Sequence, residues 1–538
     1  MYSSRDFTSN LSGNLFGGIT AAIVALPLAL AFGIASGIGP AAGLYGAVSV
    51  GFFAAIFGGT PTQISGPTGP MTVVMTAMTA SYLASYPDTG LALAFSTVLL
   101  GGLLQILFGL LRIGKYIIMV PYPVISGFMT GIGVIIILLQ LGPLLGHPAI
   151  GEITNALTAL PTQLSNYSSK AVLAGGTSLA IIFLWRGRYN RLIPSPLLAL
   201  IVATLTLKVI FPDNSIATIG DIPSTLPTLQ LPTFRFDILQ SMLTNALMLA
   251  VLGSIDSLLT SLVADNITGT QHDSDRELVG QGIGNMVAGL IGGLPGAGAT
   301  MRTMVNIRAG GSGPLSGVIH AALLLSMVAG LGFLFRSIPL AALAGILIKV
   351  GIDIIDWPFI KRLHRLPSFP VVLMTTVFLL TVFVDLITAV FVGVFIKNMV
   401  TINKLSDLQL GTLVISDGVL DLERLPAEQS RVLSEHAGET LLLRVTGPLS
   451  YAVGRGLNHR LRQKLGDNKL LLIDIADASI VGTSTAMVLE DLVRNALGKG
   501  IKVQLIGANK ANHSELWQIG LIDLVRKENC LTQIDEAF

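Results

Sequence analysis

Two long apolar stretches of this chain are broken by glycine and proline in the same way. The breaks are residues 65–70 (SGPTGP) and 295–300 (PGAGAT), and each comes shortly after a Gly-Gly pair. Lipid cannot satisfy unpaired backbone N–H and C=O groups, so non-helical backbone at membrane depth survives only where protein buries it or where it lines a polar cavity. Two matching breaks therefore indicate such a cavity, where half-helices can direct their N-terminal amides at an anion.

The composition agrees with a membrane protein. Hydrophobic residues make up 51% of the chain and charged residues only 12%, whereas a soluble chain carries about 25% charged residues. Cys530 is the single cysteine, which excludes an intramolecular disulfide. The net charge of +2 says little about partners, and no nucleic acid is expected among them. Residues 1–12 are polar and lack a cleavable signal pattern, so we expect the first apolar segment to be retained.

About fourteen segments have a length compatible with crossing a membrane, for which roughly 20 apolar residues are needed, or fewer in a buried or broken helix. They begin near Asn14, Ala41, Thr68, Gly90, Pro123, Ala171, Ile193, Ile238, Glu277, Ala299, Pro314, Leu340, Pro367 and Thr388.

The charges of the short loops predict the orientation, because loops rich in Lys and Arg stay in the cytoplasm. Cationic loops follow the fourth, sixth, twelfth and fourteenth segments, and their residues are Arg112, Lys115, Arg186, Arg188, Arg191, Lys361, Arg362, Arg365 and Lys404. All of these are even-numbered ends. We therefore expect a multi-pass protein of the inner (plasma) membrane with both termini in the cytoplasm, and the cation-poor residues 213–232 outside.

Glycine spacing indicates that the two halves are related. Gly46 and the pair at residues 58–59 have the same spacing as Gly280 and the pair at residues 292–293, and Ala54 corresponds to Ala288. Seven segments per half is an odd number, so such a repeat would be inverted across the membrane. Glycine is common in membrane helices and can align by chance, but the matching breaks favour a repeat.

The character of the chain changes after Lys404, where charges become frequent and apolar runs short. We divide the chain into a transmembrane domain (1–404), a linker with the start of the cytoplasmic region (405–436) and a small α/β domain (437–538). Residues 441–445, 470–474 and 502–507 are predicted strands, and residues 453–465 and 484–498 are predicted amphipathic helices.

Several motifs resemble those of the SulP family of inorganic anion transporters, and the resemblance covers nearly the whole chain. They are residues 17–22, 25–29, 43–45, 65–68 and 277–285. The resemblance implies an α-helical polytopic membrane protein with fourteen segments in two inverted repeats of seven, divided into core and gate domains. It also implies a C-terminal cytoplasmic STAS domain of α/β fold, a regulatory and dimerising module, and hence a homodimer.

Within the family, residues 253–260 and 296–300 look similar to the BicA-type sodium-dependent bicarbonate transporters of cyanobacteria. This resemblance implies a Na⁺ site at Asp256, Thr260, Gly298, Ala299 and Thr300. Bicarbonate would lie between the starts of the third and tenth segments. The candidate substrate-binding residues are Thr68, Gly69, Gln63, Ser65, Ala299, Thr300 and Arg302. No cofactor is expected beyond Na⁺ as the coupling ion.

The chemistry of Asp256 supports this assignment. An ionised carboxylate inside an apolar segment costs about 2.5–3.5 kcal/mol on insertion scales and usually marks an ion path. Thr260 lies one helical turn further along, on the same face. Two alternatives remain open, a neutral Asp256 that is hydrogen-bonded within the bundle and a carboxylate that couples transport to protons.

Arg302 departs from the BicA-type pattern, which has a small residue there, whereas many other SulP members carry arginine. Its guanidinium could hold a divalent oxyanion such as sulfate in a bidentate way. Alternatively, it pairs with Asp256, or it points into a cytoplasmic vestibule as part of a general positive field.

Three other groups of residues have a weaker interpretation. Gln63 and Ser65 either contact the ligand or cap the half-helix, and we expect capping for Ser65. Lys349 and Asp385 form an interdomain ion pair or lie at interfaces, and they are not expected to bind substrate. In the STAS domain, Gly482 takes the place of the acid in the family's phosphoacceptor turn, so no phosphorylation control is expected and Thr483 or Ser484 is expected to cap the following helix.

The sequence favours a secondary anion carrier. An enzyme is not expected, because no metal-spaced cluster, nucleophile-base pair or Walker-type motif is present, and ion gradients remain as the energy source. We predict Na⁺-coupled bicarbonate uptake by an elevator-like movement of the core domain. The alternatives are transport of sulfate, another oxyanion or a dicarboxylate by H⁺ coupling or exchange, and an anion channel.

Overall fold

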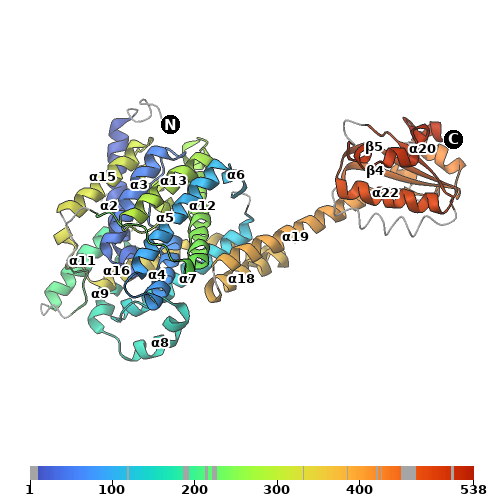
Figure 1. Ribbon diagram of the computed structural model, residues 1–538. Coiled ribbons are helices and arrows are strands. Elements are labelled where there is room, and N and C mark those ends of the chain that lie inside the picture. Colours follow the sequence, from blue (N-terminus) through green and yellow to red (C-terminus); the bar gives the residue numbers. More distant parts are fainter. Residues whose placement is uncertain are drawn as a thin grey trace. The chain divides into compact units, whose positions relative to one another are not determined.

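The computed structural model describes residues 10–117, 120–185, 193–211, 216–220, 227–330, 332–384, 386–419, 422–425, 427–449, 468–509 and 514–538. It contains two compact units, Met1–Val394 and Phe395–Phe538, shown in Figure 1. The first unit is built from helices, and the second contains a five-stranded sheet.

The first half of the helical unit contains seven helices that begin within three residues of the predicted starts. They are α2 (Leu11–Ala35), α3 (Pro40–Phe57), α4 (Gly69–Ser85), α5 (Gly90–Leu110), α7 (Tyr122–Leu144), α9 (Ser169–Leu184) and α11 (Ser195–Ile210). The short helix α6 (Gly114–Ile117) follows α5. Helix α8 (Ile153–Ser165), which the sequence analysis did not predict, makes an angle of 113° with α9.

The second half repeats this order. Seven of its helices also begin within three residues of the predicted starts, and they are α12 (Leu239–Thr268), α13 (Ser274–Leu290), α14 (Thr300–Arg308), α15 (Leu315–Gly330), α16 (Leu340–Ile354), α18 (Ser368–Phe383) and α19 (Leu386–Thr412), which continues past Val394 into the second unit. The short helix α17 (Trp357–Ile360) precedes α18. Among the described residues, six helices are long and apolar enough to cross a membrane, or seven if the bent pair α8 and α9 is one span.

Helix contacts show that the two halves are related. Three pairs of helices in contact have a counterpart seven helices further along the numbered series of segments: α3 with α15 and α13 with α5, α2 with α15 and α12 with α5, and α7 with α18 and α16 with α9. Figure 1 shows α2, α3 and α15 side by side, next to α5, α12 and α13. These helices and their neighbours α4 and α14 form one group, and α7, α9, α11, α16 and α18 form a second group.

The repeated glycines are the points of closest approach between the halves. A methyl group at Gly46 of α3 would lie 2.2 Å from the carbonyl oxygen of Leu294, just after α13. A methyl group at Gly280 of α13 would lie 2.4 Å from the backbone nitrogen of Gly58, just after α3. The contacts are reciprocal, so the equal spacing of these glycines reflects a repeat and not chance.

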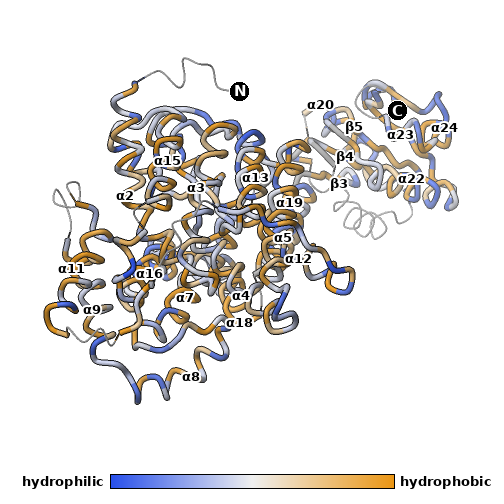
Figure 2. The backbone as a smooth tube through the Cα atoms, turned by 60° about the vertical axis from the view of Figure 1, so that its left-hand side comes forward, coloured by the Kyte–Doolittle hydropathy of each residue, from blue (hydrophilic) through white to orange (hydrophobic). Residues whose placement is uncertain are grey.

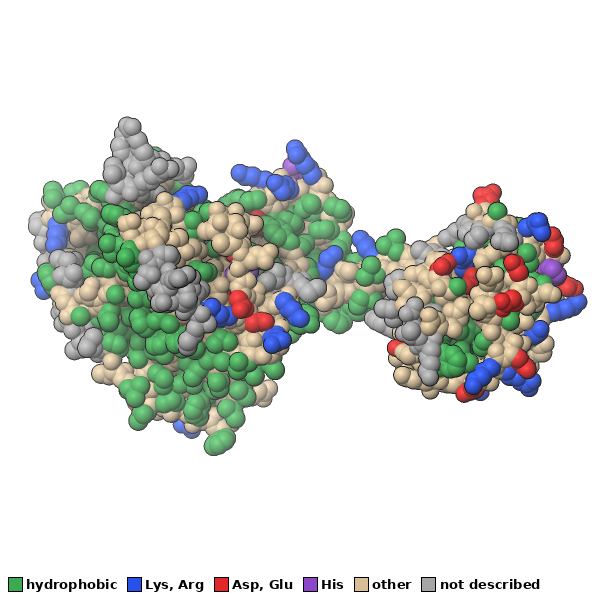
Figure 3. Space-filling model, turned by 90° about the horizontal axis from the view of Figure 1, so that it is seen from above, with side chains coloured by type: hydrophobic (Ala, Val, Ile, Leu, Met, Phe, Trp, Pro, Cys, Tyr) green, Lys and Arg blue, Asp and Glu red, His purple; other side chains and the backbone are tan. Residues whose placement is uncertain are grey.

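The surfaces of the two units differ in chemistry. Figure 2 shows hydrophobic residues all along the helices of the first unit. In Figure 3 hydrophobic side chains form wide patches on the visible face of that unit, whereas acidic and basic side chains are interspersed over the second unit. The first surface suits lipid and the second suits water.

The second unit contains a sheet of five strands in chain order, β3 (Val414–Ser416), β4 (Thr440–Leu449), β5 (Leu470–Val481), β6 (Lys502–Ile506) and β7 (Cys530–Leu531). Strand β3 is antiparallel to β4, and the other neighbours are parallel. The helices of this unit are α20 (Ala427–Glu435), α22 (Thr483–Gly498), α23 (Ser514–Gln518) and α24 (Leu521–Val525). Buried residues of the strands contribute to two hydrophobic clusters, the larger of which includes residues of α22.

Three predicted strands and one predicted helix of this unit are confirmed, as β4, β5, β6 and α22. The predicted helix at residues 453–465 lies outside the described residues, as do Arg186, Arg188, Arg191 and Asp385. The expectation that Thr483 or Ser484 caps α22 is wrong, because Gly482 is the N-cap residue and makes no side-chain cap. Strand β3 lies in the predicted linker; its three residues are too few to show a strand pattern in the sequence.

Candidate functional site

The two breaks pair with each other as a short antiparallel ladder. Strand β1 (Ser65–Gly66) lies against β2 (Ala297–Gly298), with Ser65 opposite Gly298 and Gly66 opposite Ala297. The backbone N–H of Ala299 also donates to the carbonyl oxygen of Ile64 at 2.9 Å. This pairing satisfies backbone groups that lipid could not satisfy.

Helices α4 and α14 start directly after the two paired strands. Thr68 is the N-cap residue of α4 and Ala299 that of α14, and neither provides a side-chain cap. Since the first N–H groups of a helix have no partner within it and carry a partial positive charge, these two starts are suited to an anion. Thr68 is 8% exposed, and Gly69, which follows it, is buried beside a cavity of about 20 Å³.

Helix α12 holds the second break through two hydroxyl groups. The Thr260 hydroxyl donates to the carbonyl oxygen of Gly298 at 3.0 Å and lies 2.8 Å from the hydroxyl of Thr300. The backbone N–H of Gly298 donates to the Ser257 hydroxyl at 3.0 Å. The structure thus brings together Thr260, Gly298, Ala299 and Thr300, as the resemblance implied.

Asp256 lies on α12 one turn before Thr260 and faces the start of α4. The hydroxyl of Thr68 and the guanidinium of Arg302 are the groups near its carboxylate, and the Thr68 hydroxyl is itself buried with no hydrogen-bond partner among the described residues. One carboxylate oxygen, Oδ2, is buried and has no hydrogen-bond partner within the described part of the chain. A buried acceptor of this kind is costly unless a ligand completes it.

Arg302 of α14 crosses over the first break. Its side chain is only 2% exposed, and its Nη2 atom donates to the carbonyl oxygen of Pro67 at 2.7 Å. Gly66 has a φ of +151°, and a methyl group there would lie 2.8 Å from Nη1 of Arg302. A side chain at residue 66 would thus collide with the guanidinium, and only glycine fits.

The structure corrects two interpretations of Arg302. It does not point into a solvent-filled vestibule, because it is buried, and it forms no direct ion pair with Asp256 in the described structure. Its Nη1 atom is buried and has no hydrogen-bond partner in the part of the chain that the structure describes. His320 of α15 is fully buried, interacts electrostatically with Arg302, and has neither ring nitrogen hydrogen-bonded among the residues described.

A fully buried carboxylate on α13, Glu277, holds the segment between α3 and the first break. Its Oε2 atom accepts from the backbone N–H groups of Gly59 and Thr60, at 2.8 and 2.9 Å. Its Oε1 atom accepts from the side-chain amides of Gln63 and Gln281, at 2.7 and 2.8 Å. The carboxylate therefore receives four N–H bonds, which compensate for the loss of water.

The same face of α13 continues with Gln281 and Asn285. Gln281 donates to the Ser65 hydroxyl at 2.6 Å. Asn285 accepts from the backbone N–H of Gly296 at 2.8 Å and donates to the Gly296 carbonyl at 2.9 Å. One face of α13 thus holds both breaks.

The weaker interpretations are also corrected. Ser65 does not cap α4, because it lies in β1 and accepts the bond from Gln281. Gln63 does not cap the half-helix either, since its amide bonds Glu277 and accepts from Ser261 at 3.0 Å. Lys349 pairs with Asp353 of its own helix at 2.5 Å, and Asp385 lies outside the described residues.

Sequence analysis missed the roles of Glu277, Gln281 and Asn285. They fall within the motif at residues 277–285, but they were read there only as part of a family pattern. These three polar residues are spaced by four on a predicted membrane helix, which places them on one face. That spacing is the sequence signal from which their role could have been predicted. Ser257, Ser261 and His320 had no comparable signal.

The fold and the site together define a class of protein. A helical inverted repeat, two paired helix breaks and a buried acid beside a guanidinium are features of a secondary transporter for small ions. Comparison with known proteins agrees: the model of the sulfate permease family matches residues 11–404, and that of the STAS domain matches residues 431–537. The chain belongs to the sulfate permease family of anion transporters, and its second unit is a STAS domain.

Individual relatives span most of the chain. It is 47% identical to a bicarbonate transporter, BicA, of Synechocystis, over 93% of this chain and 88% of that protein. It is 24% identical to a chloroplastic sulfate transporter of Arabidopsis thaliana, over 93% of this chain and 75% of that one. The solved transmembrane domain of a cyanobacterial bicarbonate transporter BicA matches with 54% identity and a TM-score of 0.67, over 71% of this chain and 98% of that structure. The structure of SLC26A9 has the same fold, with 18% identity and a TM-score of 0.81, over 100% of this chain and 90% of that one.

Proposed function

We propose that the protein takes up bicarbonate together with Na⁺. The observation that carries this proposal is the buried Oδ2 atom of Asp256, which has no partner among the described residues and belongs to the helical turn before Thr260, whose hydroxyl bonds the second break. The names of the similar proteins from Synechocystis and from the solved BicA domain support the choice of bicarbonate.

The residues around Asp256 suit Na⁺ chemically. Na⁺ is a hard cation and prefers oxygen ligands, as the larger hard cations do. A carboxylate, the hydroxyls of Thr260 and Thr300, and the backbone carbonyl of Gly298 supply such oxygens. With Na⁺ bound, the negative charge of Asp256 would be offset, which is what a buried carboxylate without an ion-pair partner requires.

The anion would lie between the starts of α4 and α14. Their uncapped first turns supply backbone N–H groups next to Thr68 and Ala299. Na⁺ at Asp256 would remove a negative charge that otherwise repels the anion, since Asp256 faces Thr68. Binding of each ion therefore favours binding of the other, and the coupling is reciprocal.

Movement of one helix group past the other would carry both ions. Both breaks and all proposed ligands lie in the group α2 to α5 and α12 to α15, which would act as the core, and the second group would act as the gate. The positive-inside rule supports cytoplasmic termini and a cytoplasmic STAS domain. Exposed apolar residues of α22 and the C-terminus, Met487, Leu497 and Phe538, support dimerisation through that domain.

Sulfate is a second candidate, because Arg302 places an unpartnered guanidinium nitrogen behind the first break. A guanidinium is suited to a divalent oxyanion, which needs more positive charge than bicarbonate. One similar protein from Arabidopsis is named a sulfate transporter. Under this alternative, transport would be coupled to H⁺ or would proceed by exchange.

The experiment is uptake of labelled bicarbonate and labelled sulfate into proteoliposomes, with and without a Na⁺ gradient. We expect bicarbonate uptake that depends on Na⁺, and we expect Asp256→Asn to lose at least ~100-fold in Na⁺-dependent rate, because a neutral amide is a far weaker cation ligand than a carboxylate. The matched control is Asp88→Asn, an exposed acid outside the site.

Each outcome has a distinct meaning. Unchanged Na⁺ dependence in Asp256→Asn, with the variant folded, would refute the Na⁺ site. Sulfate uptake that needs no Na⁺ would favour the second candidate. Ion currents without stoichiometric coupling would indicate a channel.

A further inference from the structure

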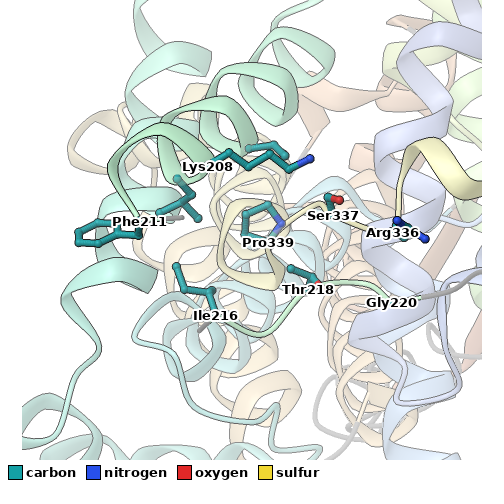
Figure 4. Close-up of a pocket in the computed structure, with 10 residues that line it drawn as sticks. Lys208, Phe211, Ile216, Thr218, Gly220, Arg336, Ser337 and Pro339 are labelled. Carbon is teal, nitrogen blue, oxygen red and sulfur yellow. The ribbon is translucent and has the colours of Figure 1, made fainter. Parts of the chain in front are cut away.

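A cavity far from the two breaks has the chemistry of a phosphate site. It measures about 380 Å³ and lies between the end of α11, the segment at residues 216–220 and the residues before α16. Its lining includes Lys208 and Arg336 together with Thr204, Thr218 and Ser337. Figure 4 shows the amino end of Lys208 directed toward the side of the cavity where Ser337 and Arg336 lie.

Two backbone segments beside this cavity pair with each other. Residues 216–220 run antiparallel to residues 336–340, with a bridge between Thr218 and Pro339. The N–H of Ile219 donates to the Ile338 carbonyl at 2.9 Å, and the N–H of Gly220 donates to the Arg336 carbonyl at 3.2 Å. This ladder brings Arg336 to Lys208, which is 128 positions away in the chain.

The positive charge of the cavity favours binding of an anion. None of the ten described residues that line it is acidic, and neither Lys208 nor Arg336 forms an ion pair with another described residue. A third cation, Lys170, lies 4.9 Å from the ring centre of Phe211, which also lines the cavity. Lysine at the end of a membrane helix often extends to the interface on its own account. Two cations in one cavity with hydroxyl groups indicate an anion site more specifically than a single lysine does, because a bound anion relieves their repulsion.

The neighbourhood of the cavity indicates where that anion comes from. Leu205, Val209 and Ile210, on the same end of α11, are 56%, 80% and 52% exposed. In a membrane protein such residues contact acyl chains. Phe211 and Ile216 add an apolar wall to the cavity itself. Apolar surface directly beside two cations matches the two parts of an anionic phospholipid, its acyl chains and its phosphate group.

We propose that this cavity binds the phosphate group of an anionic phospholipid, with Lys208 and Arg336 on the phosphate and the acyl chains along the exposed end of α11. The site belongs to the helices of the second group and shares no residue with the proposed ion site. Its test needs no transport measurement, so it stands or fails independently of the proposed function.

The experiment titrates the delipidated full-length protein in neutral detergent with short-chain phosphatidylglycerol, short-chain phosphatidylcholine and inorganic phosphate, and it follows the melting temperature. A ligand that binds only the folded state raises the melting temperature in a saturable way. We expect half of the effect at an at least ~10-fold lower concentration of phosphatidylglycerol than of phosphatidylcholine. The variant Lys208→Gln with Arg336→Gln should need ~10-fold more phosphatidylglycerol.

The matched control removes two cations from a loop without a cavity, by Lys361→Gln with Arg362→Gln, and should leave the titration unchanged. Should the double variant at the cavity fail to fold, Lys208→Gln alone should raise the required concentration ~3-fold. Equal titrations of wild type and cavity variant would overturn the proposal. Inorganic phosphate acting at the same concentrations as phosphatidylglycerol would replace it with a site for free oxyanions.

Discussion

The first and second breaks share one backbone shape but are held by different side chains. Both are short strands followed by a helix start, and they pair with each other. At the first break, Glu277 has its hydrogen-bonding capacity filled by four N–H groups. On α12, whose Thr260 hydroxyl bonds the second break, Asp256 keeps a buried oxygen that has no partner among the described residues. One acid is structural and the other is available to a ligand.

The repeat shows how this asymmetry arises. By the spacing that relates Gly46 to Gly280, the polar residues of α13 at 277, 281 and 285 correspond to Gly43, Ala47 and Gly51 of α3. The small residues of α3 leave room where the polar residues of α13 make bonds. Arg302 lies over Gly66 next to Ala47, and a methyl group at Gly51 would lie 3.1 Å from the His320 ring. One half therefore supplies a polar helix face, and the other supplies the space for basic groups.

The comparison indicates that the backbone and the side chains of the two breaks have different roles. The backbone symmetry brings two positive helix starts to one place, where an anion is favoured whichever half is considered. The side chains are not symmetric, and they decide which co-ion and which anion fit. Variants at the two breaks should therefore differ in kind, with effects on folding at Glu277 and on ion affinity at Asp256 and its neighbours.

The largest effect among the predictions that follow is expected for Glu277→Gln. The variant's amide replaces one acceptor oxygen by an NH₂ group. This group faces N–H donors, so at least one buried hydrogen bond is lost and two donors are left facing each other. We expect a loss of about 3 kcal/mol in the free energy of unfolding, which corresponds to a fall of ~5 °C or more in melting temperature. Thermal unfolding in detergent measures it.

The control for this variant is Asp273→Asn on the same helix. Asp273 is exposed and caps α13, and asparagine caps helices equally well. Its melting temperature should not change. If Glu277→Gln melted like the wild type but lost Na⁺ affinity, Glu277 would be an ion ligand and the contrast between the breaks would be wrong.

Thr260→Val should have the next largest effect, and on Na⁺ affinity. The variant keeps the shape of the side chain and removes the hydroxyl that bonds Gly298 and Thr300. We expect the Na⁺ concentration for half-maximal uptake to rise ~10-fold, or ~1.4 kcal/mol, while the KM for bicarbonate at saturating Na⁺ changes little. Uptake at varied Na⁺ measures it.

Thr268→Val is the matched control, because its hydroxyl bonds only groups at the far end of α12. It should behave as the wild type. An unchanged Na⁺ response in Thr260→Val would remove the second break from the coupling mechanism.

Much of the fold could be predicted because it follows from local sequence. Apolar segments mark the helices, and glycine with proline marks the breaks, since lipid penalises every alternative. Asp256 and Thr260 could be placed on one face because a helix brings residues four apart together. These inferences need no knowledge of tertiary contacts.

The remaining features depend on contacts between distant parts of the chain. Glu277 meets the backbone of Gly59 and Thr60, which are more than 200 residues away. Whether Arg302 pairs with Asp256 or crosses to Pro67 depends on how α14 lies against the first break. Ser65 was expected to cap α4 because it precedes the helix, but the pairing of the breaks makes residues 65–66 a strand and leaves Thr68 as the N-cap residue.

The smallest effect is expected for Thr68→Val, on the anion side of the comparison. The Thr68 hydroxyl faces Asp256 at the start of α4, where we place the anion. Valine keeps the side-chain shape, so only one neutral hydrogen bond to the ligand is lost, which is worth about 0.5–1.5 kcal/mol. We expect the KM for bicarbonate to rise ~3-fold with the melting temperature unchanged. The control is Thr97→Val, whose side chain is also buried and whose hydroxyl bonds the Leu93 carbonyl of α5. A larger effect on Na⁺ than on bicarbonate would show that the first break also binds the cation, and the two breaks would then be alike in function as they are in shape.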